Sequence, residues 1–180
     1  ILAGLEREGD QLVGGQAIEV WGFLFGVKSP KGEPLALTED ADWLGSRQDA
    51  QWLCENLSEF ASYDLQMPGD FDSTPSSALV FIKRGDKHYM MDFLRSIVGP
   101  SVEEIRKLAV TVELGGSRIQ VMHPVLCMHS RMANLEVLES KRSGNGPIQA
   151  RWMTEILGVY FQYLVAAHAP AIDVKKQCQK

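Results

Sequence analysis

Apolar residues recur with two different spacings along this chain, and together they predict strands alternating with helices. Short apolar runs ending at glycine, proline or aspartate are typical of strands, whereas apolar positions three and four apart share one face of a helix. The strands expected from this pattern cover 11–13, 35–44, 78–83, 87–94, 109–114 and 118–122. The helices expected cover 16–25, 48–60, 102–108, 125–140 and 147–168, with the end of another at 1–9.

Turn residues indicate how the later strands pair. Gly85-Asp86 and Gly115-Gly116 each separate two strand-like runs, which predicts two antiparallel hairpins. The stretch 65–77 is rich in Pro, Gly, Asp and Ser and is expected to be a loop. Because hairpins exclude a purely parallel sheet, the pattern favours a mixed sheet.

The fold class expected is α+β, with a mixed β-sheet flanked by helices and followed by a C-terminal helical portion. We expect 1–122 to form the sheet-containing core and 123–180 to pack on it as helices, in one compact unit. In the helix over 125–140, helical spacing places four apolar residues inward: Leu126, Met132, Leu135 and Leu138.

Composition and net charge limit the classes of protein to which this chain can belong. With 180 residues, 45% of them hydrophobic and 23% charged, the chain has the profile of a globular domain. A net charge of −5 gives no overall field that attracts nucleic acid, although a local basic groove is compatible with it. No apolar run is long enough to span a bilayer. The first residue is Ile1 rather than methionine, so we expect a processed or trimmed start.

Cysteine usage points to a reducing compartment. Cys54, Cys127 and Cys178 are odd in number, widely spaced and without a CxxC pair. This pattern fits reduced thiols in a cytoplasmic protein better than a disulfide framework.

Candidate chemistry begins with two aspartates inside one expected strand. Asp40 and Asp42 are two positions apart, so in a strand they project from the same face with Cα atoms about 6–7 Å apart. Two such carboxylates repel each other unless a cation lies between them, and Mg²⁺ takes oxygen ligands of this kind. The alternative is a surface strand with two solvated acids.

A third acid and a glycine pair accompany these aspartates. Asp92 lies in an otherwise apolar strand, where a charge is costly unless it is paired or binds metal; alternatively it faces water or pairs with Arg95. Gly14-Gly15 lies at an expected strand-to-helix turn, where backbone N–H groups can approach phosphate. Three acids beside such a turn fit metal-assisted nucleotidyl transfer, in which two cations stabilise the attacking and leaving oxygens.

These residues resemble a known active-site pattern. Gly14-Gly15, Thr38-x-Asp40-x-Asp42 and Asp92 are similar to the motif of the DNA polymerase beta-like nucleotidyltransferase superfamily, nearest to its minimal, AbiEii-type toxin-like branch. The resemblance extends over 12–138. It implies a nucleotidyltransferase-like fold and transfer of a nucleoside monophosphate from an NTP to a hydroxyl group, with release of pyrophosphate.

The resemblance also implies roles for individual residues and partners. Asp40, Asp42 and Asp92 would be catalytic and hold Mg²⁺ or Mn²⁺, and Gly14, Gly15 and Thr38 would bind the nucleotide. The acceptor would be a protein, a tRNA or a small molecule, without a membrane. A toxin-type role would add an antitoxin or a homodimer partner.

Several positions depart from the family pattern. Ala36 stands where related proteins often have a basic residue, and Gly15 replaces a serine that donates a hydroxyl to phosphate. After the last hairpin the family often offers a lysine, and the nearest basic residue here is Arg131. Arg47, at an expected helix start, can reach a triphosphate or can be an ordinary solvated first-turn residue.

Other candidates have simpler structural interpretations. The basic residues Lys83, Arg84 and Lys87 indicate a charged turn that protects a sheet edge. Lys141-Arg142 and Arg151 can contact an acceptor nucleic acid or form a solvated loop. The histidines lack zinc spacing, no GxSxG nucleophile turn is present, and Trp43 should pack beneath the aspartates.

Three functional hypotheses are compatible with these residues. The first is a metal-dependent nucleotidyltransferase. The second is a nucleotidyltransferase-fold module that has lost catalysis and binds nucleotide or a protein partner, which Ala36 favours. The third is a structural α+β domain whose three aspartates are unrelated.

Overall fold

The computed structural model describes residues 10–30, 40–57, 59–69 and 71–168. Within these ranges the strands form one seven-stranded sheet in the order β3-β4-β5-β2-β1-β7-β6. The strands are β1 (Gln11–Leu12), β2 (Asp40–Leu44), β3 (Ser62–Gln66), β4 (Ser76–Arg84), β5 (Lys87–Leu94), β6 (Val110–Leu114) and β7 (Ser117–Val121). The helices are α1 (Gly14–Leu24), α2 (Arg47–Leu57), α3 (Val102–Leu108), α4 (Pro124–Val137) and α5 (Asn145–His168), with a 3-10 turn, η1 (Glu139–Lys141).

The sheet is mixed, as the two hairpins require. β4 with β5 and β6 with β7 pair antiparallel around their glycine turns, while β2 pairs parallel with β5 and antiparallel with β1. The α+β class and its C-terminal helical portion are therefore confirmed. The parallel pairing of β2 with β5 matters most for the site, because it sets two distant strands side by side.

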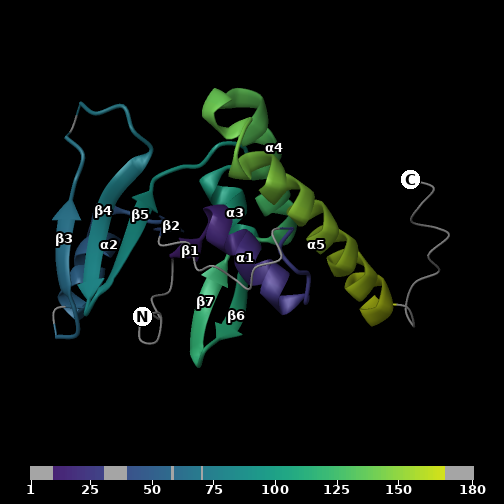
Figure 1. The fold of residues 1–180 in the computed structure, drawn as a ribbon, viewed down its shortest axis with the longest axis horizontal. Helices are drawn as coiled ribbons and strands as arrows, with labels where there is room; N and C mark the ends of the chain where they lie inside the picture. Colours follow the sequence, from purple (N-terminus) through teal and green to yellow (C-terminus); the bar gives the residue numbers. More distant parts are fainter. Residues whose placement is uncertain (1–9, 31–39, 58, 70, 169–180) are drawn as a thin grey trace.

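Helices lie on the sheet in two separate groups (Figure 1). α2 contacts β3, β4 and β5, and in the view of Figure 1 it lies behind β3 and β4. α1 contacts β2 and also packs against α4 and α5. One apolar core joins the two groups through completely or almost completely buried side chains that include Leu12, Ile18, Leu44, Leu53, Val80, Ile82, Met153 and Ile156.

The structure corrects several expected element boundaries. β3 is an edge strand that the pattern does not predict, and only its last two residues lie in the segment 65–77 expected to be a loop. β4 begins at Ser76, the penultimate residue of that segment. α1 begins at Gly14, two residues before the expected start, and α2 ends at Leu57 rather than at residue 60. The expected helix over 125–140 is divided into α4 and η1. The segments 1–9 and 35–39 lie outside the described residues.

The inward face of α4 also differs from the expectation. Met132 is 52% exposed, whereas Arg131 is only 7% exposed. The buried residues of α4 are Pro124, Leu126, Cys127, Ser130 and Arg131. The prediction was wrong for Met132 because apolar periodicity ignores which neighbours the helix face meets. Here that face turns a guanidinium toward acidic residues of the sheet.

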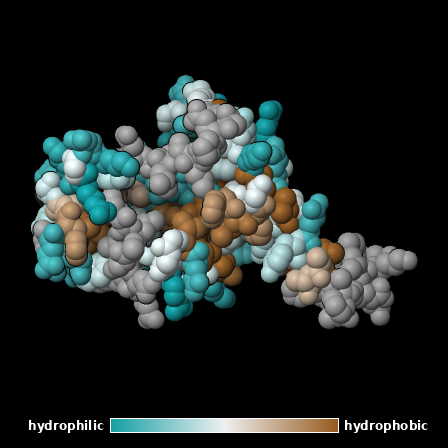
Figure 2. All heavy atoms as spheres, turned by 60° about the horizontal axis from the view of Figure 1, so that its bottom comes forward, coloured by the Kyte–Doolittle hydropathy of each residue, from teal (hydrophilic) through white to brown (hydrophobic). Residues whose placement is uncertain are grey.

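Apolar surface remains exposed on the side of α1 and α5. Figure 2 shows hydrophobic side chains gathered across the middle of the molecule, where these helices lie in Figure 1. Large exposed side chains there include Phe23 and Leu24 of α1 and Phe161 and Tyr163 of α5. Among the described helices, none combines the length and the hydropathy that a bilayer crossing requires.

Candidate active site

The register of the sheet places Asp42 directly beside Asp92. β2 and β5 run parallel, with Asp42 opposite Asp92 and Asp40 opposite Met90. Neighbouring strands are about 4.8 Å apart, and opposed residues project from the same face. Asp40 shares that face because it lies two positions from Asp42. The structure therefore brings together acids that are fifty positions apart in the chain.

The two neighbouring carboxyl groups disfavour each other's ionised form. Burial raises the pKa of Asp42 above its ordinary value, Asp92 and Asp40 raise it further, and Lys141 and Arg131 oppose the shift. Burial also raises the pKa of Asp92, against the hydrogen bond that the Ser76 hydroxyl donates to its Oδ1 over 2.6 Å. Such a pair favours any cation that can share its oxygens.

The start of α1 lies against this acid pair. The Val13 amide donates to the Asp42 carbonyl over 2.8 Å, and the helix begins at the next residue. Gly14 has φ +65°, and a Cβ there would overlap the Asp42 carboxylate. A Cβ at Gly15 would lie 2.8 Å from Nε2 of Gln149. Gly14 therefore needs glycine for its backbone conformation and for close approach, whereas at Gly15 the end of the Gln149 side chain can move aside.

Helix α1 presents its first turn without a side-chain cap. Val13, the N-cap residue, makes no side-chain hydrogen bond, and the first turn of α1 contains no acidic residue. The first N–H groups of a helix carry partial positive charge and lack intrahelical partners. This end of α1 is consequently suited to anions such as phosphate.

A polar cavity lies beside Asp40, Asp42 and the start of α1, and Asp92 is not among the described residues that line it. It has a volume of about 390 Å³, and it is lined by Gly15, Gln16, Asp40, Asp42, Arg131, Ser140, Lys141, Ser143, Gly144, Asn145, Gly146 and Gln149. Its walls thus come from α1, β2, α4 and the segment that leads into α5. Two acids, Asp40 and Asp42, line the cavity together with the start of α1 and two basic residues, Arg131 and Lys141.

Arg131 is the buried cation of the cavity. Burial lowers the pKa of its guanidinium, while Asp42 and Cys127 oppose that shift. Its Nε has no hydrogen-bond partner among the described residues. A buried guanidinium with an unmade hydrogen bond is costly, and an anion in the cavity would supply the missing acceptor.

The donor set fits a magnesium ion held jointly with a substrate. Within the described residues, no three histidine, cysteine or acidic side chains form a metal site by themselves. Mg²⁺ is usually bound through one or two carboxylates together with substrate phosphates. The Asp42–Asp92 pair meets that requirement, and metal binding here stays a prediction.

The remaining predicted site residues have different positions. Thr38 lies outside the described residues. Arg47 donates from Nη2 to the Pro68 carbonyl over 2.7 Å and does not line the cavity, so its contact with nucleotide also stays a prediction. Arg95 donates to the Ser76 carbonyl. Trp43 is 5% exposed, which confirms that it packs in the core.

Sequence reasoning misses the part of the wall that precedes and begins α5. The pattern of the chain offers Lys141 as a contact for an acceptor nucleic acid or as a solvated loop residue, and it does not single out Asn145 or Gln149. Their signal is weak, because polar residues between two helices are usual at a surface. Only the packing of α5 against α1 turns them toward the aspartates.

Comparison with known proteins adds information at the level of fold. Neither the models of protein families nor the curated proteins match this chain. Among solved structures, the Megavirus polyadenylate synthase is similar, with a TM-score of 0.51 and 13% sequence identity over 83% of this chain. The mixed α+β fold of this chain is therefore similar to that of part of the synthase. The chain covers 28% of the synthase, so the likeness concerns architecture; membership of the nucleotidyltransferase superfamily and of its AbiEii-like branch stays a prediction.

Proposed function

We propose that this chain is a metal-dependent nucleotidyltransferase that moves a nucleoside monophosphate from an NTP to a hydroxyl acceptor. The observation that carries the proposal is the register of Asp42 beside Asp92, next to the uncapped start of α1. The fold shared with a polyadenylate synthase supports the same class of reaction. Each of these features also occurs in proteins with other functions, so none identifies the reaction by itself.

The basic wall of the cavity is suited to the triphosphate. The first N–H groups of α1, the buried Arg131 and the neighbouring Lys141 would neutralise the phosphate charges. Because Arg131 is fixed by burial in α4, it would orient the triphosphate as well as attract it. The NTP would then place its α-phosphorus above the Asp42–Asp92 pair.

The acid pair would serve the acceptor and the metal. Asp42 and Asp92, with Asp40, would hold Mg²⁺ or Mn²⁺, which supplies stabilisation of negative charge on the phosphate oxygens. Asp92 would accept the proton of the acceptor hydroxyl, aided by its raised pKa. The acceptor oxygen forms a bond to the α-phosphorus as the bond to pyrophosphate breaks, and the proton leaves to solvent.

Transfer of label from each α-³²P NTP, with Mg²⁺ or Mn²⁺, tests this proposal. A cell extract should serve first as the source of acceptor. Asp42→Asn and Asp92→Asn should each reduce transfer by at least about 10²-fold, since they remove a metal ligand or a general base. Asp86→Asn, an exposed turn position of the β4–β5 hairpin, is the matched control and should keep full activity.

Two results would change the conclusion. Full transfer by Asp42→Asn would reject the acid pair as the reacting centre. NTP binding by the wild-type chain with no transfer to any fraction would instead favour the alternative, a nucleotidyltransferase-fold module that binds nucleotide without catalysis.

A further inference from the structure

The face of the sheet that carries the aspartates continues beyond them. Asp92 of β5 is opposite Leu79 of β4, and Met90 is opposite Phe81, so all four side chains share the face of Asp42. Phe81 is one strand spacing and one side-chain repeat away from Asp92, roughly 8 Å between Cα atoms. The acid pair therefore lies at one end of a larger surface.

The same face extends to the free edge of the sheet. Lys83 is opposite His88 on β5 and Ser62 on β3, and Phe81 is opposite Asp64 on β3. These residues, with Leu79, Met90 and Asp92, form what we call the open sheet face. Among the described helices, α2 is the one that packs on β3 and β4, and it does so on the opposite face, where Val80 and Ile82 are buried.

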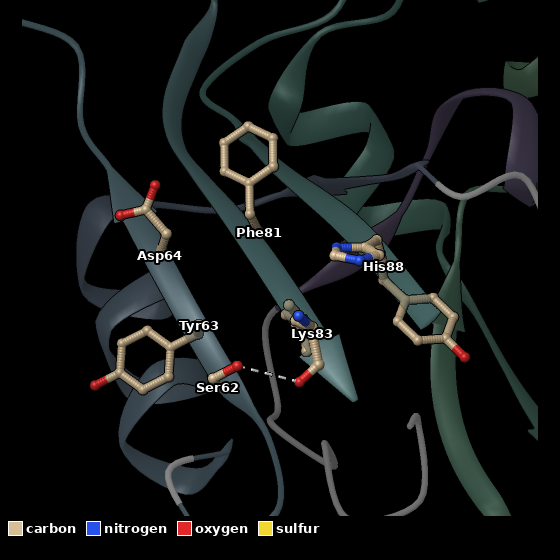
Figure 3. A pocket seen from close by; sticks show the side chains of 8 residues that line it. Ser62, Tyr63, Asp64, Phe81, Lys83 and His88 are labelled. Carbon is tan, nitrogen blue, oxygen red and sulfur yellow. Dashed lines mark hydrogen bonds between the residues drawn. The ribbon is translucent and has the colours of Figure 1, made fainter. Parts of the chain in front are cut away.

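A shallow hollow of about 260 Å³ lies on these strands, and residues of β3, β4 and β5 alone line it. Figure 3 shows Phe81, Lys83 and His88 side by side on neighbouring strands, with Ser62 at the edge. The Ser62 hydroxyl donates to the Lys83 carbonyl over 3.4 Å. Phe81 is 38% exposed, so an aromatic ring lies at a solvent-facing position beside a lysine and an imidazole.

Charge distinguishes this end of the molecule. Lys83, Arg84, Lys87 and His88 are all exposed around the β4–β5 turn, and Asp86 is the one acid between them. The chain as a whole carries a net charge of −5, so this cluster is a local departure from its average. Asp64 on β3 is opposite Phe81, and Lys83 lies two positions from the ring on the same face. An exposed ring near a lysine matches the chemistry of single-stranded nucleic acid, whose bases stack on aromatic rings and whose phosphates attract lysine.

We propose that the open sheet face docks a single-stranded nucleic acid as the acceptor, with its terminal hydroxyl at Asp92. This inference rests on the proposed function, because it assigns the acceptor of that same reaction. A base stacks on Phe81, and Lys83 contacts a backbone phosphate. A protein acceptor is less suited to this face, since the exposed basic residues around the β4–β5 turn favour a polyanion.

Binding can be measured without any transfer reaction. The test uses fluorescence anisotropy of the full chain with labelled 12-nucleotide RNA and DNA strands, in the absence of NTP and metal. Phe81→Ala should weaken binding by about 5- to 150-fold, as expected for the loss of one stacked base. Phe81→Trp should restore it. Lys83→Ala should reduce the slope of log K against log salt by about 0.7, the value for one phosphate contact.

Control variants distinguish binding at the open sheet face from nonspecific binding and from the transfer reaction. Phe71→Ala removes a fully exposed ring outside the face, and Lys107→Ala removes an exposed lysine of α3; neither should alter binding. Asp42→Asn should abolish transfer and keep oligonucleotide binding, so that failure of catalysis is distinguishable from failure of docking. Preference for the RNA or the DNA strand identifies the acceptor.

Three outcomes would overturn the docking proposal. They are no binding of either strand by the wild-type chain, equal binding by Phe81→Ala and wild type, and transfer of label to protein but never to nucleic acid. Thermal melting of each variant confirms that it is folded before binding is compared.

Discussion

At the scale of the residue, the site contains buried charged groups that are only partly compensated by opposite charges around them. Burial and Asp92 raise the pKa of Asp42, while Lys141 and Arg131 only partly oppose this. Arg131 in turn is buried, and its Nε has no partner among the described residues. Both excesses point to ligands of opposite charge, a cation between the acids and an anion beside the guanidinium.

The acid pair predicts a pH dependence of stability. The pKa of Asp42 and of Asp92 is raised above the ordinary 3.8, so the folded state keeps protons that the unfolded chain has released. Stability contributed by these carboxyls is therefore fully present below pH 3.8 and is lost as pH rises through the raised pKa. Without metal, Asp42→Asn should melt at a higher temperature than wild type at pH 7.

Thermal melting across a pH series checks this prediction. The difference between Asp42→Asn and wild type should shrink as the pH falls toward 4, because a raised pKa lets the wild-type carboxyl take up a proton as the pH falls. Asp86→Asn, at an exposed turn, should show no such trend. A constant difference at all pH values would mean that the effect of the substitution comes from packing rather than from charge.

Substitution of Arg131 should lower kcat/KM for the NTP and leave the free energy of unfolding almost unchanged. Arg131→Met should lower kcat/KM for the NTP by about 10- to 150-fold, the value of a lost hydrogen bond to a charged group. The free energy of unfolding should fall little, because loss of the attraction to Asp42 is offset by removal of the cost of burying the guanidinium. Steady-state kinetics and urea unfolding measure the two effects, with Arg106→Met of α3 as the exposed control. Unfolding of Arg131→Met would contradict a binding role.

The position of Arg131 marks the limit of sequence reasoning at this scale. Two acids on one strand and a third in an apolar strand are visible in the sequence, because alternation fixes which face each occupies. A buried arginine in a helix is not visible, since apolar spacing favours Met132 for the inward position. Arg131 of α4 faces Asp42, and the location of Asp42 depends on how the strands pair.

At the scale of the element, the glycine pair links a strand end to a helix start. Gly14 has a positive φ and contacts the Asp42 carboxylate, so it combines a backbone requirement with a steric one. Gly26 has the same φ of +65° but no atom within 4 Å of its added Cβ. Gly14 and Gly26 therefore form a matched pair in which only the contact with Asp42 differs.

Substitution of Gly14 and Gly26 by alanine should separate the effect of the positive φ from the effect of close approach to Asp42. Gly26→Ala should destabilise the fold by about 1–2 kcal/mol, the cost of the left-handed conformation alone. Gly14→Ala should cost more and should also abolish transfer, because its methyl group displaces the Asp42 carboxylate. Urea unfolding and the labelled-NTP assay measure the two effects. Equal losses in both variants would show that close approach at Gly14 is unimportant.

Elements whose own sequence carries a signal, such as a glycine turn or a helix cap, were predicted. Elements that form because a neighbouring strand pairs with them were not. Both hairpins follow from glycine turns between apolar runs, and the capping box at Ser101 and Glu104 begins α3 where expected. β3 was missed because four of its five residues are exposed and its alternation rests on two apolar residues alone, Tyr63 and Leu65. It is a strand because β4 offers it backbone partners along its whole length.

At the scale of the whole molecule, the order of the strands creates the site. The fold class could be expected from the alternation of strands and helices, but the neighbours of β2 could not. Placing β2 between β5 and β1 brings Asp42 beside Asp92 and, through β1, beside the start of α1. Helices α4 and α5 then close one side of the cavity, while the sheet beyond β5 stays open.

This arrangement predicts that a divalent cation stabilises the entire fold. An ion that binds only the folded acid pair raises the free energy of unfolding by about 1.4 kcal/mol at ten times its Kd, which corresponds to roughly 3–6 °C in a domain of this size. Mg²⁺ should therefore raise the melting temperature of the wild-type chain at pH 7. The shift should vanish in Asp42→Asn and Asp92→Asn and persist in Asp86→Asn. Because protons compete with the ion for the same oxygens, the shift should also fall as the pH approaches 4. A shift that is equal in all variants would place the cation elsewhere, and the Asp42–Asp92 pair would then lose its assigned role in holding the metal.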